Sequence, residues 1–169
     1  MFRRTFTILI ALLILASTIA SLPPALGDEQ RSFSDNVLVS GEDPSRLVQR
    51  NPAIAVSQDG NISVVWEEYD VYESLSIYFA CSDDGGETFS EKKPVNESAD
   101  DQAEPKVVVN STGTIFVTWA ESGPDGPDIM FAMSNDSGNS FSNAIEVAVS
   151  TEGQFDPDIA VSGEMVYIT

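Results

Sequence analysis

The sequence predicts an all-β protein built from a repeated unit of four short antiparallel strands. Three observations predict this fold class. Short apolar segments rich in Val, Ile and Phe recur along residues 52–169, and turn residues such as Asp59-Gly60 and Thr112-Gly113 separate them. Helical periodicity is absent from the same stretch.

The first 27 residues are expected to be a secretory signal peptide. Arg3 and Arg4 give a basic start, residues 8–19 form an apolar run, and residues 25–27 have the small-x-small pattern that signal peptidase requires. An uncleaved membrane anchor is the alternative, because the apolar stretch is close to the minimum length for crossing a bilayer. Either way, we expect the protein to be secreted, extracellular or held at the cell surface.

Charge and composition exclude several functions. Residues 28–169 carry all 27 acidic residues and six of the eight basic ones. Such a surface repels nucleic acid and anionic membranes, so membrane association is expected only through an uncleaved signal anchor. The chain has no histidine and a single cysteine, which excludes an internal disulfide, a Cys/His zinc site and every triad that needs histidine. We expect no cofactor and no metal site, with Ca²⁺ as the open alternative.

A repeat of 52 to 53 residues organises the chain from residue 51 to residue 169. The segment PAIAVS at Pro52 recurs as PKVVVN at Pro105 and as PDIAVS at Pro157. Four β-rich segments separated by turns make up each repeat, which matches one four-stranded blade of a β-propeller. The expected strands are 52–57, 61–68, 76–82 and 89–96 in the first repeat and 105–110, 114–121, 128–134 and 141–149 in the second.

The tryptophans and the cysteine are expected to be core residues. Trp66 and Trp119 occupy the same place in the two repeats and alternate with apolar neighbours, which favours packing between blades over a sugar-binding platform. Cys81 aligns with Met133, which favours a core position for the thiol.

Residues 28–50 are expected to hold an outer strand and a linker. The segment FSDNVLVS at 33–40 resembles the fourth strands of the repeats, although no other strands of its own blade precede it. Such a strand would pair with the last blade and close a ring; a leader that merely looks similar is the alternative. Residues 51–169 then hold two blades and the start of a third, too few for a propeller. We expect an N-terminal fragment whose remaining blades complete the fold, with a genuine short protein as the alternative.

Two turns match the Asp box, S-x-D-x-G-x-T-[FW]. SDDGGETF at 82–89 matches every defined position, and SNDSGNSF at 134–141 matches with Ser in place of Thr. On these residues the chain resembles the sialidase/BNR-repeat β-propellers. The resemblance implies that each box joins the third and fourth strands of a blade, on the face opposite the active centre. Structural roles are therefore expected for Ser82, Asp84, Gly86, Thr88, Phe89, Ser134, Asp136, Gly138, Ser140 and Phe141.

The opposite face is where we expect a ligand site, in the connections from fourth to first strands and from second to third strands. Asn51, Glu104 and Asp156 each precede the proline of a first strand, so we expect them around the mouth of a central channel. Capping of that strand is the alternative role for these three residues. The candidate ligand-binding residues are Arg46, Arg50, Asn51, Tyr69, Tyr72, Asp101, Glu104 and Asp156.

The resemblance implies that a sialidase would need an arginine cluster for the substrate carboxylate, an acid/base Asp and a Tyr nucleophile paired with Glu. Its typical Arg-Ile-Pro segment has only Arg50-Asn51-Pro52 as a counterpart. Arg46 and Arg50 are expected in a loop, where fixing both side chains costs conformational entropy, so no catalytic residue is assigned. We favour a binding or scaffold module for glycans or extracellular polymers over an enzyme. The alternative is an exo-α-sialidase or a related glycoside hydrolase.

Overall fold

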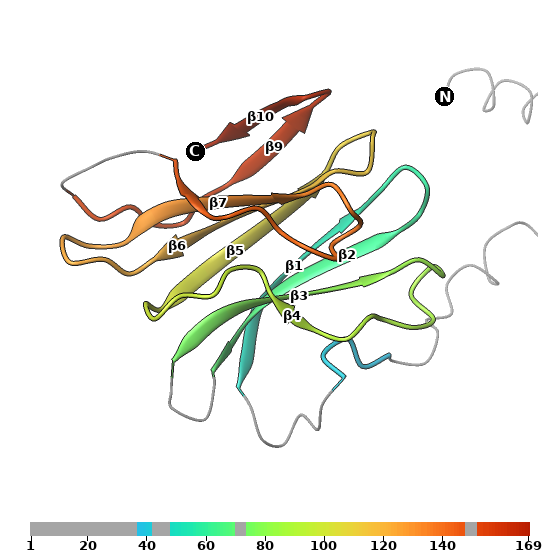
Figure 1. The fold of residues 1–169 in the computed structure, drawn as a ribbon, viewed down its shortest axis with the longest axis horizontal. Helices are drawn as coiled ribbons and strands as arrows, with labels where there is room; N and C mark the ends of the chain where they lie inside the picture. Colours follow the sequence, from blue (N-terminus) through green and yellow to red (C-terminus); the bar gives the residue numbers. More distant parts are fainter. Residues whose placement is uncertain (1–36, 42–47, 70–73, 148–151) are drawn as a thin grey trace, which may run out of the picture. The chain divides into compact units, whose positions relative to one another are not determined.

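The computed structural model describes residues 37–41, 48–69, 74–147 and 152–169. Every regular element in these residues is a β-strand, which confirms the all-β prediction, and the strands form antiparallel sheets (Figure 1). No helix in this part of the chain is long and apolar enough to cross a membrane. The segment expected to be a signal peptide, residues 1–27, lies outside the described residues.

The first four-stranded sheet is built from the first copy of the repeat. Its strands lie side by side in the order of the sequence, and each neighbouring pair is antiparallel. Gly60, at a φ of 90°, gives the turn between the first two strands a conformation that a side chain would strain. The strands are β1 (Gln49–Val56), β2 (Ile62–Tyr69), β3 (Leu75–Ser82) and β4 (Lys93–Pro94).

The second four-stranded sheet repeats this order with the second copy of the sequence repeat. Its strands are β5 (Gln102–Val109), β6 (Ile115–Glu121), β7 (Asp128–Ser134) and β8 (Ile145–Glu146). A separate antiparallel pair follows, made of β9 (Ile159–Ser162) and β10 (Met165–Ile168). The third copy of the repeat therefore begins as the first two copies do, with two paired strands.

The fourth strands are much shorter than the predicted segments 89–96 and 141–149, because β4 and β8 each contain two residues. Side-chain hydroxyls provide the reason. Ser90 Oγ accepts the backbone N–H of Cys81 at 3.1 Å, and Ser142 Oγ accepts that of Met133 at 3.1 Å. A hydroxyl therefore takes the place of a strand carbonyl and interrupts the regular ladder.

β1 and β5 begin at Gln49 and Gln102, three residues earlier than predicted. Both strands contain an irregularity in register directly before the proline that the prediction used as the strand start. Asn51 and Glu104 lie in these bulges with φ values of 48° and 58°. A bulge inserts an extra residue and lets the pairing continue on both sides of it, so a proline near a strand start does not mark the true end of pairing.

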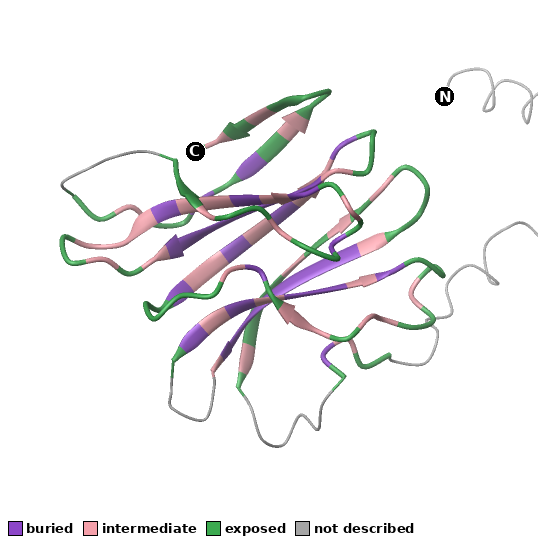
Figure 2. Ribbon diagram, in the orientation of Figure 1, coloured by how far each residue is buried: buried purple, intermediate pink, exposed green. Residues whose placement is uncertain are grey.

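The two four-stranded sheets pack together through one apolar core. Val65, Ile77 and Phe79 of the first sheet meet Val117 and Trp119 of the second in a single buried cluster. Figure 2 shows β2 buried along nearly its whole length, and β6 has the same pattern, as expected for central strands that are covered on both faces.

Trp66 lies on the other face of the first sheet, in a smaller cluster with Val64 and Ala80. Both tryptophans are buried, as predicted for packing residues.

Residues 37–41 form no strand, although 33–40 was predicted to be an outer strand. A strand needs a neighbour for its backbone groups, and no strand pairing in the described residues includes this segment. Val39 packs instead against the cluster of Val64 and Trp66. Residues 33–36, the other half of the predicted strand, lie outside the described residues.

Candidate functional site

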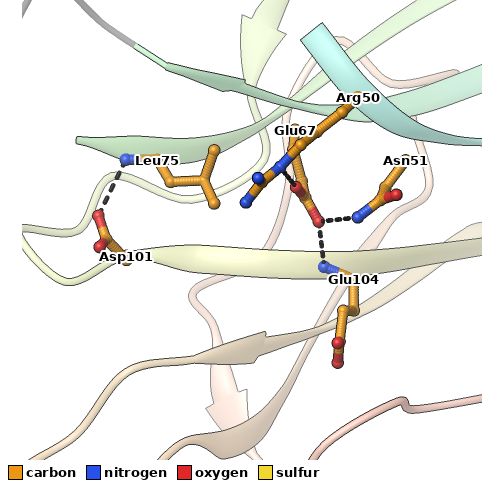
Figure 3. Close-up of polar contacts among 6 residues, drawn as sticks. All are labelled: Arg50, Asn51, Glu67, Leu75, Asp101 and Glu104. Atoms are coloured by element: carbon orange, nitrogen blue, oxygen red, sulfur yellow. Dashed lines mark hydrogen bonds and ion pairs between the residues drawn. The ribbon is translucent and has the colours of Figure 1, made fainter. Parts of the chain in front are cut away.

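A buried carboxylate, Glu67 of β2, organises the end of the first sheet where β1 begins. Glu67 is 0% exposed and lies directly opposite Arg50 of β1 in the strand register. It accepts hydrogen bonds from Arg50 Nε at 2.5 Å and from Asn51 Nδ2 at 2.8 Å (Figure 3). Its Oε1 also accepts the backbone N–H of Glu104 at 2.7 Å. Three donors thus offset the cost of burying the charge.

Arg50 lies in a strand, so the expectation that it belongs to a loop is wrong. The side chain is 46% exposed while its Nε contacts the buried carboxylate of Glu67. Its Cζ lies 5.0 Å from the centre of the Tyr69 ring, a cation–π distance. The hydrogen bond to Glu67 is the largest cause that raises the pKa of Arg50 above its usual range. The guanidinium is therefore permanently charged, held on two sides and still accessible to solvent.

This arrangement suits the binding of an anion. Because Glu67 takes Nε, the two terminal nitrogens of Arg50 remain for Tyr69 and for a ligand. Two terminal N–H groups in one plane match the two oxygens of a carboxylate. A separate groove of about 230 Å³ lies on the other face of the first sheet, and Trp66 and Pro52 are among the residues that line it.

Asn51, Glu104 and Asp156, which occupy equivalent positions in the repeats, all have a positive φ. Two of them, Glu104 and Asp156, link successive repeats through their backbone N–H groups. Glu104 donates its N–H to Glu67 of the first sheet, and Asp156 donates its N–H to Glu104 Oε2 at 2.6 Å. Glu104 and Asp156 therefore serve as connections between repeats, and both a place around a channel mouth and a capping role stay predictions.

Asp101 makes a further link between the repeats, at the start of β3. Its Oδ1 accepts the backbone N–H of Leu75 at 2.9 Å (Figure 3). Next to it, Gln102 Oε1 accepts the N–H of Ile77 at 3.0 Å. These side chains satisfy backbone donors of β3 in the part of the strand that lies beyond β4.

The structure brings four of the candidate residues together around Glu67, namely Arg50, Asn51, Tyr69 and Glu104. Asp156 is joined to this group through Glu104. Arg46 and Tyr72 lie outside the described residues.

Sequence reasoning missed Glu67 itself. An available signal was a charged residue on the same face of the strand as Val65, which lies in the core between the two sheets.

Two further carboxylates missed from the sequence, Glu68 and Glu121, fix the tryptophans. Glu68 Oε2 accepts Trp66 Nε1 at 3.1 Å and Gln49 Nε2 at 2.7 Å. Glu121 Oε2 accepts Trp119 Nε1 at 3.0 Å and Gln102 Nε2 at 2.9 Å. Because the same Gln–Glu–Trp contacts occur in both sheets, we interpret them as part of the framework.

The two turns that match the Asp box have the same internal hydrogen bonds. Asp84 accepts the N–H of Thr88 at 3.0 Å and its Oγ1 at 2.6 Å, while Ser82 Oγ donates to Asp84 at 2.7 Å. Asp136 accepts the N–H of Ser140 at 2.9 Å and its Oγ at 2.5 Å. These bonds close each turn on itself, as a structural role requires.

The same bonds lower the pKa of both aspartates. The Ser140 hydroxyl, followed by the Ser140 N–H and the Ser134 hydroxyl, lowers the pKa of Asp136 from 3.8 to about 2. The equivalent bonds from Thr88 and Ser82 lower the pKa of Asp84 further. Donors aimed at a carboxylate favour its charged form, so neither aspartate has the raised pKa of a general acid.

No group of three or more His, Cys, Asp or Glu residues among those described is arranged to hold a metal ion.

Comparisons with known proteins support the fold alone. No protein-family model matches the chain, and no curated protein matches it. A solved structure described as Hadza microbial sialidase Hz136 is similar, with a TM-score of 0.52 and 23% identity, over 59% of this chain and 26% of that one. A protein of unknown function from Dyadobacter fermentans DSM 18053 matches with a TM-score of 0.49 and 22% identity, over 55% of this chain and 26% of that one. The chain thus spans about a quarter of the length of each, and the similarity to the first of them supports a sialidase-like fold.

Proposed function

We propose that this chain is part of a secreted Asp-box β-propeller that binds glycans or other extracellular polymers, and that Arg50 recognises an acidic group on them. The observation that carries the proposal is the Arg50 guanidinium, which a fully buried Glu67 holds in place while the side chain stays 46% exposed. The secreted location rests on the composition of residues 1–27.

The way the sheets stack supports a propeller. The second sheet turns the face that carries Trp119 toward the first sheet, whereas Trp66 lies on the face of the first sheet that points away from the second. Each repeat therefore stacks in the same sense as the one before it, as propeller blades do. The backbone links from Glu104 and Asp156 to the preceding repeats run in one direction as well.

A guanidinium that is already held in place favours binding, because the Arg50 side chain has lost part of its conformational entropy before the ligand binds. Arg50 has one of its donors on Glu67 and its face on Tyr69, so fewer rotamers remain to be frozen. A carboxylate or sulfate on a polymer would meet the exposed guanidinium of Arg50.

The test is binding of a sialic acid glycoside by the full chain, measured by calorimetry. Arg50→Gln is expected to weaken binding by about tenfold or more, because a charge-assisted contact is lost. Lys106→Gln removes the same charge elsewhere in the protein and is the matched control. Equal losses in the two variants would mean that net charge, and not the Arg50 site, governs binding.

An exo-α-sialidase is the second candidate, and the fixed arginine together with the similarity to a sialidase favours it. The departure from Arg-Ile-Pro at Arg50-Asn51-Pro52 favours binding without hydrolysis. A fluorogenic sialoside distinguishes the two. The binding proposal expects no turnover above background. Turnover that falls by orders of magnitude in Arg50→Gln would establish the enzyme.

A further inference from the structure

A second cavity lies at the opposite end of β1 from Arg50. It has a volume of about 570 Å³ and opens between the turns of the first sheet and those of the second. Ser57, which follows β1, and Thr112, which precedes β6, contribute to its two sides. The volume is within the usual range for pockets that hold small molecules, roughly 300–1,000 Å³.

Two small side chains account for the open space. Ser63 and Cys81 are directly paired across β2 and β3 and both line the cavity. They lie on the same face of the first sheet as Val65 and Phe79, which pack against the second sheet. The apolar core therefore stops at this point, and the space between the sheets continues as the cavity.

The second sheet has large residues at the equivalent positions. Phe116 aligns with Ser63 and Met133 aligns with Cys81, and these two are also paired across their strands. A phenylalanine and a methionine would occupy much of the space that a serine and a cysteine leave open. The small residues of the first repeat thus leave room for the cavity, whereas the large residues of the second repeat would fill much of the equivalent space.

The lining is polar and carries no basic side chain among the described residues that form it. Hydroxyl groups come from Ser57, Ser63 and Thr112, and amide groups come from Asn61 and Asn135. Asp59 and Asp83 add carboxylates, which repel an anionic ligand. The full lining also includes Phe89, an apolar surface of the kind that sugar C–H groups contact.

We propose that this cavity binds a neutral polyhydroxylated ligand of the size of a mono- or disaccharide. Serine and threonine hydroxyls, asparagine amides and carboxylates together offer the donors and acceptors that sugar hydroxyls require. The site is separate from Arg50 in position and opposite in charge preference. It therefore stands whether or not Arg50 binds an acidic glycan.

The cysteine in the cavity wall can report whether a ligand occupies the cavity. Cys81 is the only cysteine in the sequence, lies in the cavity wall and is half-buried. The experiment measures how fast a small maleimide labels Cys81 in the full chain, with increasing glucose, galactose, N-acetylglucosamine, lactose or glucuronate. We expect saturable protection by at least one of the neutral sugars, with a Kd on the order of 1 mM or tighter, and none by glucuronate.

Three variants test whether the protection of Cys81 comes from a ligand bound in the cavity. Ser63→Phe installs the residue that the second repeat has and is expected to abolish protection. Asn135→Ala, at an exposed position of the lining, is expected to weaken binding about threefold or more, and it decides the question if Ser63→Phe does not fold. Thr114→Ala, in the same turn as Thr112 but outside the lining, is the control.

Three results would overturn the proposal. These are no saturable protection by any of the neutral sugars, equal protection by glucuronate, or unchanged affinity in both Ser63→Phe and Asn135→Ala. Arg50→Gln should leave protection of Cys81 unchanged, so failure of the acidic site is distinguishable from failure of this one.

Discussion

The first and second sheets are built from copies of one repeat, and they share some contacts and differ in others. Both hold a buried tryptophan with a Glu and a Gln, and both close the turn after the third strand with the same hydrogen bonds. They differ at the cross-strand pair Arg50–Glu67, which is Ala103–Ala120 in the second sheet. They also differ at the pair of Ser63 and Cys81 described above.

The shared contacts fix strand register and turn shape, which every repeat needs. The differing pairs lie at opposite ends of β2 and leave an exposed guanidinium at one end and a polar cavity at the other. These two pairs are the differences that change what the first sheet offers to a ligand, so we place the candidate sites of function there. Three experiments test this division between framework and site.

The largest expected effect on stability comes from removing the carboxylate of Glu67, which has no counterpart in the second sheet. Glu67→Ala leaves the partly buried N–H of Glu104 and the amide of Asn51 without their acceptor. We expect the free energy of unfolding to fall by about 2–4 kcal/mol, measured by urea denaturation. Glu91→Ala, at an exposed position, is the control and should change it by less than about 0.5 kcal/mol. A small effect at Glu67 would show that the pair is dispensable for the framework.

The two turns should respond unequally to the same substitution. A Cβ at Gly138 would lie 2.2 Å from Phe79 Cε1, whereas one at Gly86 would lie 3.2 Å from the flexible end of Ile62. Both glycines have a positive φ, so each alanine is strained, but only Gly138→Ala also displaces the core. We expect losses of about 2–3 kcal/mol for Gly138→Ala and about 1 kcal/mol for Gly86→Ala. Equal thermal melting of the two variants would contradict the packing of this turn on the first sheet.

The smallest expected effect is on how the stability of the protein depends on pH under acidic conditions. Asp136 has a lowered pKa, so its hydrogen bonds stabilise the folded chain above pH 3.8 and are lost as the pH falls toward about 2. The pKa of Asp84 is lower, so the first turn should keep its bonds to more acidic pH. Melting between pH 5 and pH 2 should therefore depend less steeply on pH in Asp136→Asn than in the unaltered protein. Identical slopes would mean that the turn carboxylate does not contribute to folding.

The sequence alone was sufficient for the second and third strands of the first two repeats, because apolar segments and turn residues are local signals. It was not sufficient for β4 and β8, since the hydroxyls of Ser90 and Ser142 interrupt the ladder from outside the strand. Placing Arg50 in a loop followed from using Pro52 as the strand start. A strand that begins three residues earlier, through a bulge, puts Arg50 opposite Glu67.

Predicting the candidate site therefore required the strand register to be known residue by residue. Local sequence patterns do not specify the register at that level. The cavity likewise required knowing which face of β2 carries Ser63. The alignment of Ser63 with Phe116 was present in the sequence, but its meaning depends on the second sheet packing against that face.

The backbone links between repeats have a consequence for how the sequence can change over evolution. Glu104 and Asp156 connect to the preceding repeats with their N–H groups, and the acceptor for Asp156 is the side chain of Glu104, so that link also needs an acceptor at the equivalent position of the preceding repeat. The position also demands a positive φ, which excludes β-branched residues far more strongly than Asn, Asp or Gly. The three repeats carry Asn51, Glu104 and Asp156 there, a drift among tolerated residues. One repeat can therefore change its other residues and acquire a new ligand while it keeps its hydrogen bonds to the neighbouring repeats.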